Sequence, residues 1–222
     1  DLIQLNTRNA EETKERVYAF RNLNNTGFSK IDLGVNGYAR SVAVADFNRD
    51  GREDMFLGYF GYDRPPFPGG QDQLLLQSSD GGLHDVSATN LPQVLDHSHG
   101  ICSADLNGDG SADIVKNLGG YQKVLINSGN GVLAEQNDLM QPLFHFEDPT
   151  YKSVWGPSGY HPISYWQCAT GDFNADGVQD VILGGGNTDV QAVDANGNTT
   201  APSIDFFGNL IGPSNALLLG NR

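Results

Sequence analysis

Short runs of apolar residues alternate with polar turns rich in Gly, Asn and Asp along the chain. The runs are about four to six residues long, which is the usual length of a β-strand and shorter than most helices. Three of them end where an acidic loop begins, and they cover 41–45, 100–104 and 167–171. Three more leave that loop, at 55–57, 114–115 and 181–183. This pattern predicts an all-β chain.

Further apolar runs follow in pairs, joined by tight polar turns. Residues 74–77 lead into 83–86 through Ser-Asp-Gly-Gly, and 124–127 lead into 132–134 through Ser-Gly-Asn-Gly. Gly-containing turns between apolar runs are typical of β-hairpins. Each unit is therefore predicted to hold four antiparallel strands, A to D, with the acidic loop as the A–B turn. A short, weak helix is expected only at 10–16, where Glu and Lys dominate.

The acidic loop is a nonapeptide, Asp-x-Asn-x-Asp-Gly-x-x-Asp, that begins at Asp46, Asp105 and Asp172. We call these three copies the first, second and third loop. Their first residues lie 59 and 67 positions apart, a longer period than that of most solenoid units. Four-stranded units that repeat at such a period are typical of the blades of a β-propeller.

The strand pattern divides the chain, a single propeller segment, into parts of blades. These are strands C and D of a preceding blade, two complete blades and a blade that lacks strand D: 1–37, 38–90, 97–138 and 165–222. About three blades and a half do not close a ring, because propellers have about four to eight blades. We therefore expect a larger propeller, of about seven blades, whose other blades lie on the same or on another chain.

The three loops predict calcium sites. Calcium takes six to eight oxygen ligands at about 2.3–2.6 Å. Positions one, three, five and nine of each loop offer side-chain oxygens, position seven offers its backbone carbonyl, and Gly at position six permits the positive φ of a sharp bend. The predicted ligands are Asp46, Asn48, Asp50, Arg52 and Asp54; Asp105, Asn107, Asp109, Ser111 and Asp113; and Asp172, Asn174, Asp176, Val178 and Asp180.

Other metals and other calcium loops fit this pattern less well. Magnesium needs a stricter octahedron, and zinc prefers nitrogen or sulfur ligands, which the loops lack. An EF-hand needs Glu at position twelve, where these loops have Leu57, Lys116 and Leu183. The remaining alternative is an Asp- and Asn-rich hairpin turn without a metal, which three copies, each followed by a strand, disfavour.

The loop followed by an apolar strand resembles the FG-GAP/VCBS repeats, whose blades form integrin-α-like propellers. The segment 76–87, Leu-Gln-Ser-Ser-Asp-Gly-Gly-Leu-His-Asp-Val-Ser, resembles the C–D hairpin of the same family. The resemblance covers roughly residues 15–222 and implies calcium on the A–B turns of one face. It implies no single function, because such repeats occur in adhesion proteins, lectins, polysaccharide lyases and other surface proteins. The long B–C segments of the first and third blades depart from the family pattern.

The charge of the chain bears on its partners and its location. The formal net charge is −14, and three divalent cations would bring it to −14 + 6 = −8. No basic face is visible, which argues against nucleic acid, and no apolar run approaches the roughly 18 residues that span a bilayer.

Without an initiator Met or a leader, the chain looks like a mature or excised segment. Weak calcium modules suit a calcium-rich environment, so we expect an extracellular location, secreted or on the cell surface.

Cys102 and Cys168 each lie just upstream of a loop, in an apolar run. Two cysteines do not build a disulfide framework, and buried free thiols are the favoured interpretation. A bridge between neighbouring repeats stays open as an alternative. It is disfavoured because the two cysteines are offset by one residue in register, which would point their side chains to opposite faces.

The long connections at 58–72, 139–166 and 184–215 are expected on the face opposite the calcium loops. The middle one is rich in aromatic and His residues: Phe144, His145, Phe146, Tyr151, Trp155, Tyr160, His161, Tyr165 and Trp166. Such side chains suit protein or glycan surfaces, although covering the core of their own blade is the favoured interpretation. We expect a protein or glycan partner on this long-loop face.

A His pair and two sequons are weaker indications of function. His97 and His99 share one face of a strand and could ligate a metal, but packing at the strand start is the favoured interpretation. The sequons at Asn24 and Asn198 permit glycosylation, and in a chain this rich in Asn, Ser and Thr about two sequons are expected by chance.

No catalytic motif is present: there is no Gly-x-Ser-x-Gly, no His-Glu-x-x-His and no phosphate-binding glycine loop. The sequence therefore favours a calcium-stabilised extracellular binding, adhesion or structural module without catalytic residues. The alternative is a polysaccharide-degrading, lyase-like propeller in which Arg64, Tyr160 and His161 support proton abstraction.

Overall fold

We describe a computed structural model of the chain. The structure describes residues 1–5, 16–36, 38–61, 68–118, 122–136, 151–153, 165–185, 190–193, 199–200 and 215–218. Within these residues the protein is all-β, and its one short helix is α1 (Ser87–Asn90). The predicted fold class is confirmed. The weak helix expected at 10–16 lies almost entirely outside the described residues.

Two sheets have the predicted four antiparallel strands in sequential order. The first contains β4 (Ala39–Ala45), β5 (Asp54–Tyr59), β6 (Gln73–Gln77) and β7 (Leu83–Asp85). The second contains β8 (Gly100–Ala104), β9 (Asp113–Asn117), β10 (Gln122–Asn127) and β11 (Leu133–Glu135). In both, the nonapeptide loop joins the first two strands, as the sequence predicts.

Three further sheets have three strands each. Before the four-stranded pair come β1 (Leu2–Gln4), β2 (Arg16–Asn22) and β3 (Phe28–Asn36). After it come β13 (Tyr165–Gly171), β14 (Asp180–Gly185) and β17 (Asn215–Leu218), which pair in the order expected for strands A, B and C. The sequence pattern missed β1 and the small sheet of β12 (Tyr151–Ser153), β15 (Val190–Val193) and β16 (Thr199–Thr200), because two to four residues give no readable alternation.

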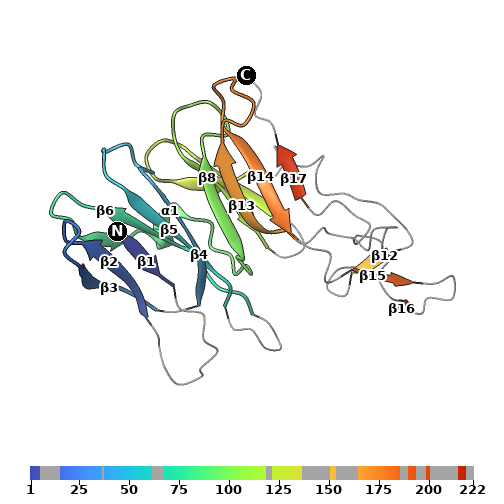
Figure 1. The fold of residues 1–222 in the computed structure, drawn as a ribbon, viewed down its shortest axis with the longest axis horizontal. Coiled ribbons are helices and arrows are strands. Elements are labelled where there is room, and N and C mark those ends of the chain that lie inside the picture. The colour runs from blue at the N-terminus through green and yellow to red at the C-terminus, as the bar shows by residue number, and fades with distance from the viewer. Residues whose placement is uncertain are drawn as a thin grey trace.

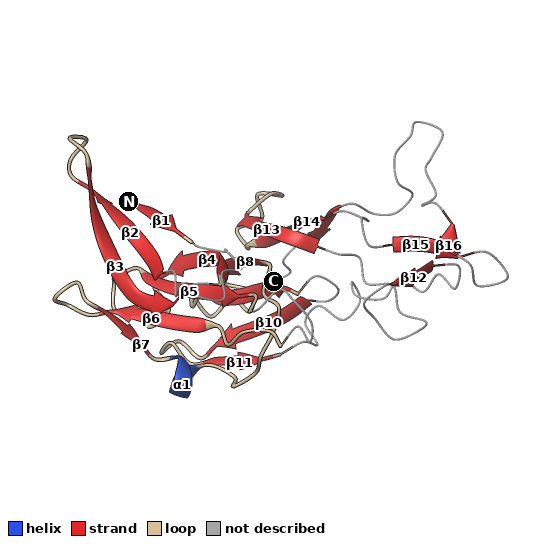
Figure 2. Cartoon of the chain, turned by 90° about the horizontal axis from the view of Figure 1, so that it is seen from below, coloured by secondary structure: helices blue, strands red, loops and turns tan. Residues whose placement is uncertain are grey.

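The first strands of successive sheets lie side by side. β4 contacts β8, and β8 in turn contacts β13 (Figures 1 and 2). The backbone N–H of Ile101 donates to Oγ of Ser41 at 3.0 Å, and Oγ1 of Thr170 donates to the carbonyl of Ser103 at 2.9 Å. Neighbouring first strands are the arrangement of propeller blades, whose repetition leaves only short edges.

Apolar clusters fill the seams between the sheets. The cluster between the two four-stranded sheets includes Phe47, Phe56 and Leu74 of one and Ile114 and Leu125 of the other. The next cluster joins Val115 and Val124 to Val181 and Leu183. A third cluster joins Val17 and Val35 to Leu57 and Leu75. Side chains along a strand point alternately to its two faces. The sheets joined by these clusters therefore bury their apolar faces against one another.

The expectation of free thiols was wrong, because Cys102 of β8 and Cys168 of β13 form a disulfide with Cα atoms 5.8 Å apart. The register argument assumed that equivalent positions in two repeats must align. The two strands belong to different sheets, and β8 packs against β13 without pairing with it. The alternation of side chains within one sheet therefore does not decide whether these two sulfur atoms meet.

No helix in the part of the chain that the structure describes is long and apolar enough to cross a membrane.

Candidate metal centres

The side chain at position one organises each loop from within. Both oxygens of Asp46 accept backbone hydrogen bonds, from Asp50 N at 3.0 Å and Gly51 N at 2.7 Å. Asp105 and Asp172 accept the equivalent pairs of bonds at 2.8–3.1 Å. The glycine at position six has φ near +84° in all three copies, the left-handed region that glycine adopts at little cost.

Positions three and five face each other in all three loops. In the first loop, Asn48 Nδ2 donates to Asp50 Oδ2 at 2.9 Å, and Asp50 Oδ1 accepts from Arg52 N at 3.0 Å. Asn107 with Asp109, and Asn174 with Asp176, repeat this geometry, followed by bonds from Ser111 N and Val178 N. The structure thus brings the predicted side chains of positions one, three and five together at the surface of each loop.

The carboxylates at position nine are buried and act as clamps. Asp54 accepts from Phe47 N at 2.9 Å inside its own loop and from Gln77 N at 2.7 Å on strand β6. Asp113 does the same with Leu106 N and Asn127 N. Burial raises the pKa of Asp54 and of Asp113 above its ordinary value, although these N–H groups oppose the shift.

In the third loop, Asp180 accepts the equivalent hydrogen bond within the loop, from Phe173 N at 2.8 Å. Sequence reasoning assigned position nine to the metal alone. The signal for the second role was already present, because an Asp that opens an apolar strand needs buried partners.

The donor chemistry of the loops fits calcium, because the converging side chains offer oxygen and the loops contain no sulfur or imidazole. Positions one, three and five of each loop would hold the ion, with the position-seven carbonyls of Arg52, Ser111 and Val178. As they stand, no three His, Cys, Asp or Glu side chains within the described ranges form a metal-binding group. Several of the acidic oxygens instead accept internal hydrogen bonds.

Two arginines lie among these carboxylates, and sequence reasoning gave neither an electrostatic role. Arg52 forms an ion pair with Asp50 of its own loop, and its Nε donates to the carbonyl of Gln77 at 2.9 Å. Arg49 of the first loop reaches the second loop, where its Nη2 lies 3.1 Å from Oδ1 of Asp109. The equivalent positions in the third loop are Val178 and Ala175.

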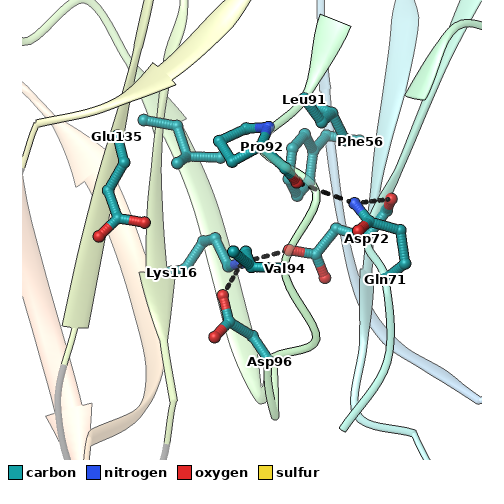
Figure 3. A pocket seen from close by; sticks show the side chains of 10 residues that line it. Phe56, Gln71, Asp72, Leu91, Pro92, Val94, Asp96, Lys116 and Glu135 are labelled. Carbon is teal, nitrogen blue, oxygen red and sulfur yellow. Dashed lines mark hydrogen bonds and ion pairs between the residues drawn. The ribbon is translucent and has the colours of Figure 1, made fainter. Parts of the chain in front are cut away.

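A buried ion cluster lies in the seam between the two four-stranded sheets (Figure 3). Lys116 on β9 forms ion pairs with Asp72, just before β6, and with Asp96, just before β8; the second pair measures 2.9 Å. All three side chains are at most 5% exposed. Asp72 also accepts from Tyr59 N at 2.8 Å and from Ser98 Oγ at 2.9 Å.

This cluster is closed to substrates. The cavity beside it, lined by Phe56, Leu91 and Lys116 among others, measures about 10 Å³, room for the centre of one water molecule. Burial raises the pKa of Asp72 in spite of Lys116. Burial acts in the same sense on Asp96, but Lys116 and Lys123 outweigh it and hold the pKa of Asp96 below its ordinary value.

The His pair packs around an aromatic ring. His97 and His99 lie with their rings 5.0 and 4.6 Å from the ring of Phe60, and the guanidinium of Arg40 stacks over the same ring at 3.6 Å. His97 Nδ1 lies 3.0 Å from the carbonyl oxygen of Phe60. The aromatic segment 139–166 lies almost entirely outside the described residues.

Comparison with protein families gives one match. The model of the FG-GAP-like repeat matches residues 2–57, which include the first loop, strands β1 to β4 and the first part of β5. The chain contains an FG-GAP-like repeat. The resemblance to FG-GAP repeats that the loop pattern indicated is thereby confirmed. No curated protein sequence matches the chain.

Among solved structures, the chain is similar to a lectin from Agrocybe aegerita, described as recognising non-reducing terminal N-acetylglucosamine. The sequence identity is 16%, and the match covers 86% of this chain. This chain spans 61% of the length of the lectin chain. The TM-score of 0.30 is too low for this likeness to bear on fold or function.

Proposed function

We propose that the chain is part of a calcium-stabilised, extracellular β-propeller that serves as a binding module for a protein or glycan. The observation that carries the calcium part is the hydrogen-bond pattern shared by all three loops. In each loop the backbone N–H of position five donates to side-chain oxygens of positions one and three, so these two oxygens lie together in all three copies. Calcium binding there would be structural, because the loops join the first two strands of their blades.

The disulfide supports an extracellular location. Disulfides persist in oxidising compartments and are rare in the cytosol, and Cys102–Cys168 joins two blades of this chain. Extracellular calcium modules bind with dissociation constants up to about 10⁻⁴–10⁻³ M, which suits surroundings rich in calcium. Both features therefore favour the same location.

The binding role is supported by the FG-GAP-like repeat and by the aromatic content of the long connections. Tyr and Trp side chains supply large contact areas on protein surfaces, and sugars pack on their rings. The three calcium loops would stabilise the scaffold on one face, while the partner binds at the opposite, long-loop face. Additional propeller blades, from the same or another chain, would complete the ring.

Thermal unfolding tests the calcium part. In excess chelator the melting temperature should fall by several degrees, because a ligand at 100 times its Kd stabilises the folded state by about 2.7 kcal/mol per site. Asp46→Ala should reduce this response by removing the side-chain oxygens of position one. Glu53→Gln is the matched control, because Glu53 is an exposed acid in the same loop that is not a predicted ligand. Equal melting temperatures with calcium and with chelator would refute the calcium part.

Binding assays with the full chain in millimolar calcium test the partner. A panel of immobilised glycans, acidic polysaccharides included, should retain the protein without being degraded. Tyr160→Ala and His161→Ala should weaken retention if the long-loop face is the binding surface. Degradation of a polysaccharide would contradict a pure binding role and point to the lyase-like alternative.

A further inference from the structure

Arg49 belongs to the first loop, but its guanidinium lies on the second. Nη2 donates to Oδ1 of Asp109 at 3.1 Å and also to the backbone carbonyl of Asp109. The same group covers the turn between β10 and β11, where a Cβ added to Gly129 would lie 3.2 Å from the guanidinium carbon. The guanidinium of Arg49, from the first loop, thus lies against Asp109, the predicted position-five ligand of the second loop.

The two loops are held together without this arginine. Asn127 is fully buried, and its Nδ2 donates to the carbonyl of Phe47 at 2.8 Å and to that of Ala112 at 3.0 Å. Its backbone N–H donates to Asp113 at 2.8 Å. One buried amide therefore fixes the first loop to the second. An exposed ion pair such as Arg49–Asp109, with side chains 46% and 40% exposed, adds little to stability.

The backbone at position four does not require an arginine either. Arg49 has φ of +60°, and Gly108 occupies the same position of the second loop with φ of +75°. A residue with a side chain costs roughly 1–2 kcal/mol more than Gly in this region. Ala175 adopts φ of +61° at the same position of the third loop, so the backbone accepts a non-Gly residue there, and Arg49 differs from it by what its long side chain contacts.

We propose that Arg49 couples the first two loops by weakening calcium binding at the second. The inference rests on the proposed calcium function. The guanidinium of Arg49 occupies one oxygen of Asp109 that would otherwise bind calcium. Its positive charge also repels a divalent ion a few ångströms away. At an exposed site and physiological ionic strength this repulsion corresponds to about a three- to tenfold loss of affinity. The coupling is reciprocal, so calcium in the second loop loosens Arg49 from Asp109.

The second and third loops provide the internal comparison. The residue that would reach from the second loop to the third is Gly108, which has no side chain. Asp176, the position-five residue of the third loop, has Asn174 as its described side-chain partner. The calcium affinity of the third loop should therefore be independent of any substitution at Arg49.

The test is a calcium titration of the ¹⁵N-labelled full chain, followed by NMR at three glycine amides. Gly51, Gly110 and Gly177 each donate to the position-one Asp of their own loop, at 2.7, 2.8 and 2.8 Å. Each amide therefore reports on one loop. Arg49→Gly should lower the calcium midpoint of Gly110 about three- to tenfold and leave that of Gly177 unchanged.

Two further variants separate charge from shape. Arg49→Gln keeps a long polar side chain without the charge and should give the same shift at Gly110. Arg52→Ala is the matched control, since Arg52 pairs with Asp50 of its own loop; it should move the Gly51 midpoint and leave Gly110 in place. The shift caused by Arg49→Gly should also shrink in high salt.

The outcomes are distinct. If both Arg49 variants leave the Gly110 midpoint unchanged, or raise it, the coupling is overturned and the calcium function stands. If none of the three glycine amides responds to calcium in the parent protein, the proposed function fails and the coupling fails with it.

Discussion

The two seams that flank the sheet of β8 to β11 are built from different chemistry. The seam toward β4–β7 contains the buried Asp72–Lys116–Asp96 cluster and the amide of Asn127. The seam toward β13, β14 and β17 contains the disulfide Cys102–Cys168. Both also have an apolar cluster. Repeats with the same strand plan can therefore be joined either by polar groups that must all be satisfied or by one covalent bond.

The difference concerns specificity as well as stability. A buried ion cluster gains little over well-packed apolar residues, because the desolvation of its charges offsets their attraction. Its members, however, tolerate only one relative position of the two blades, since a shifted blade would leave a buried charge unpaired. The disulfide imposes no such electrostatic requirement, and it acts mainly by restricting the unfolded chain.

The largest predicted effect comes from breaking the ion cluster. Lys116→Met keeps the length of the side chain but leaves Asp72 and Asp96 buried without their shared cation. Removal of one partner from a buried ion pair costs about 3–5 kcal/mol. Denaturant unfolding measures this loss. Lys123→Met is the control, since Lys123 is more exposed and should cost clearly less; equal losses would contradict a special role of Lys116.

Next in size is the loss of the disulfide. Its cysteines are 66 residues apart, and closing a loop of that size in the unfolded chain corresponds to about 4 kcal/mol in the chain-entropy model, with about 2–4 kcal/mol typical of measured bridges. Cys102→Ala with Cys168→Ala should lose this much in urea unfolding. The double variant should also be insensitive to reductant. A parent protein whose stability does not change on reduction would argue against the bridge.

The sequence predicted what depends on local patterns and missed what depends on how blades meet. The three loops, their hydrogen-bonding glycines and the strands beside them follow from spacing alone. Lys116 gave no such signal, because an Lys in a strand usually points to solvent. Phe47 and Phe173 occupy the same loop position, yet one is fully buried and the other 49% exposed. Only the contacts of the neighbouring blade decide such cases.

The clamp at position nine gives a smaller effect within the second blade. In Asp113→Asn only one oxygen can accept, and the amide nitrogen would face the N–H of Leu106 or of Asn127. One unsatisfied buried donor costs about 1–3 kcal/mol. The loss should appear in chelator as well as in calcium. Asp105→Asn, at the less buried position one, also disturbs backbone hydrogen bonds of its loop but should lose less in chelator than Asp113→Asn; the reverse ranking in chelator would contradict the clamp.

The smallest effect distinguishes the two seams by pH. The pKa of Asp96 lies below its ordinary value of 3.8, so near that pH the carboxyl of Asp96 binds more protons in the unfolded chain than in the folded protein. The stability that Asp96 contributes is therefore complete above about pH 4 and is lost as the pH falls through the lower, folded pKa. Unfolding free energies of the parent and of Asp96→Asn between pH 3 and pH 5 measure this loss.

The parent should lose stability more steeply in acid than Asp96→Asn, because the variant has no carboxyl to protonate at that position. All calcium-loop carboxylates are common to both proteins, so the difference between the two profiles isolates the cluster of Lys116. A disulfide does not titrate, so the seam of Cys102 and Cys168 should add nothing to the slope, and the cysteine double variant should run parallel to the parent. Parallel profiles for Asp96→Asn and the parent would remove the electrostatic distinction between the seams.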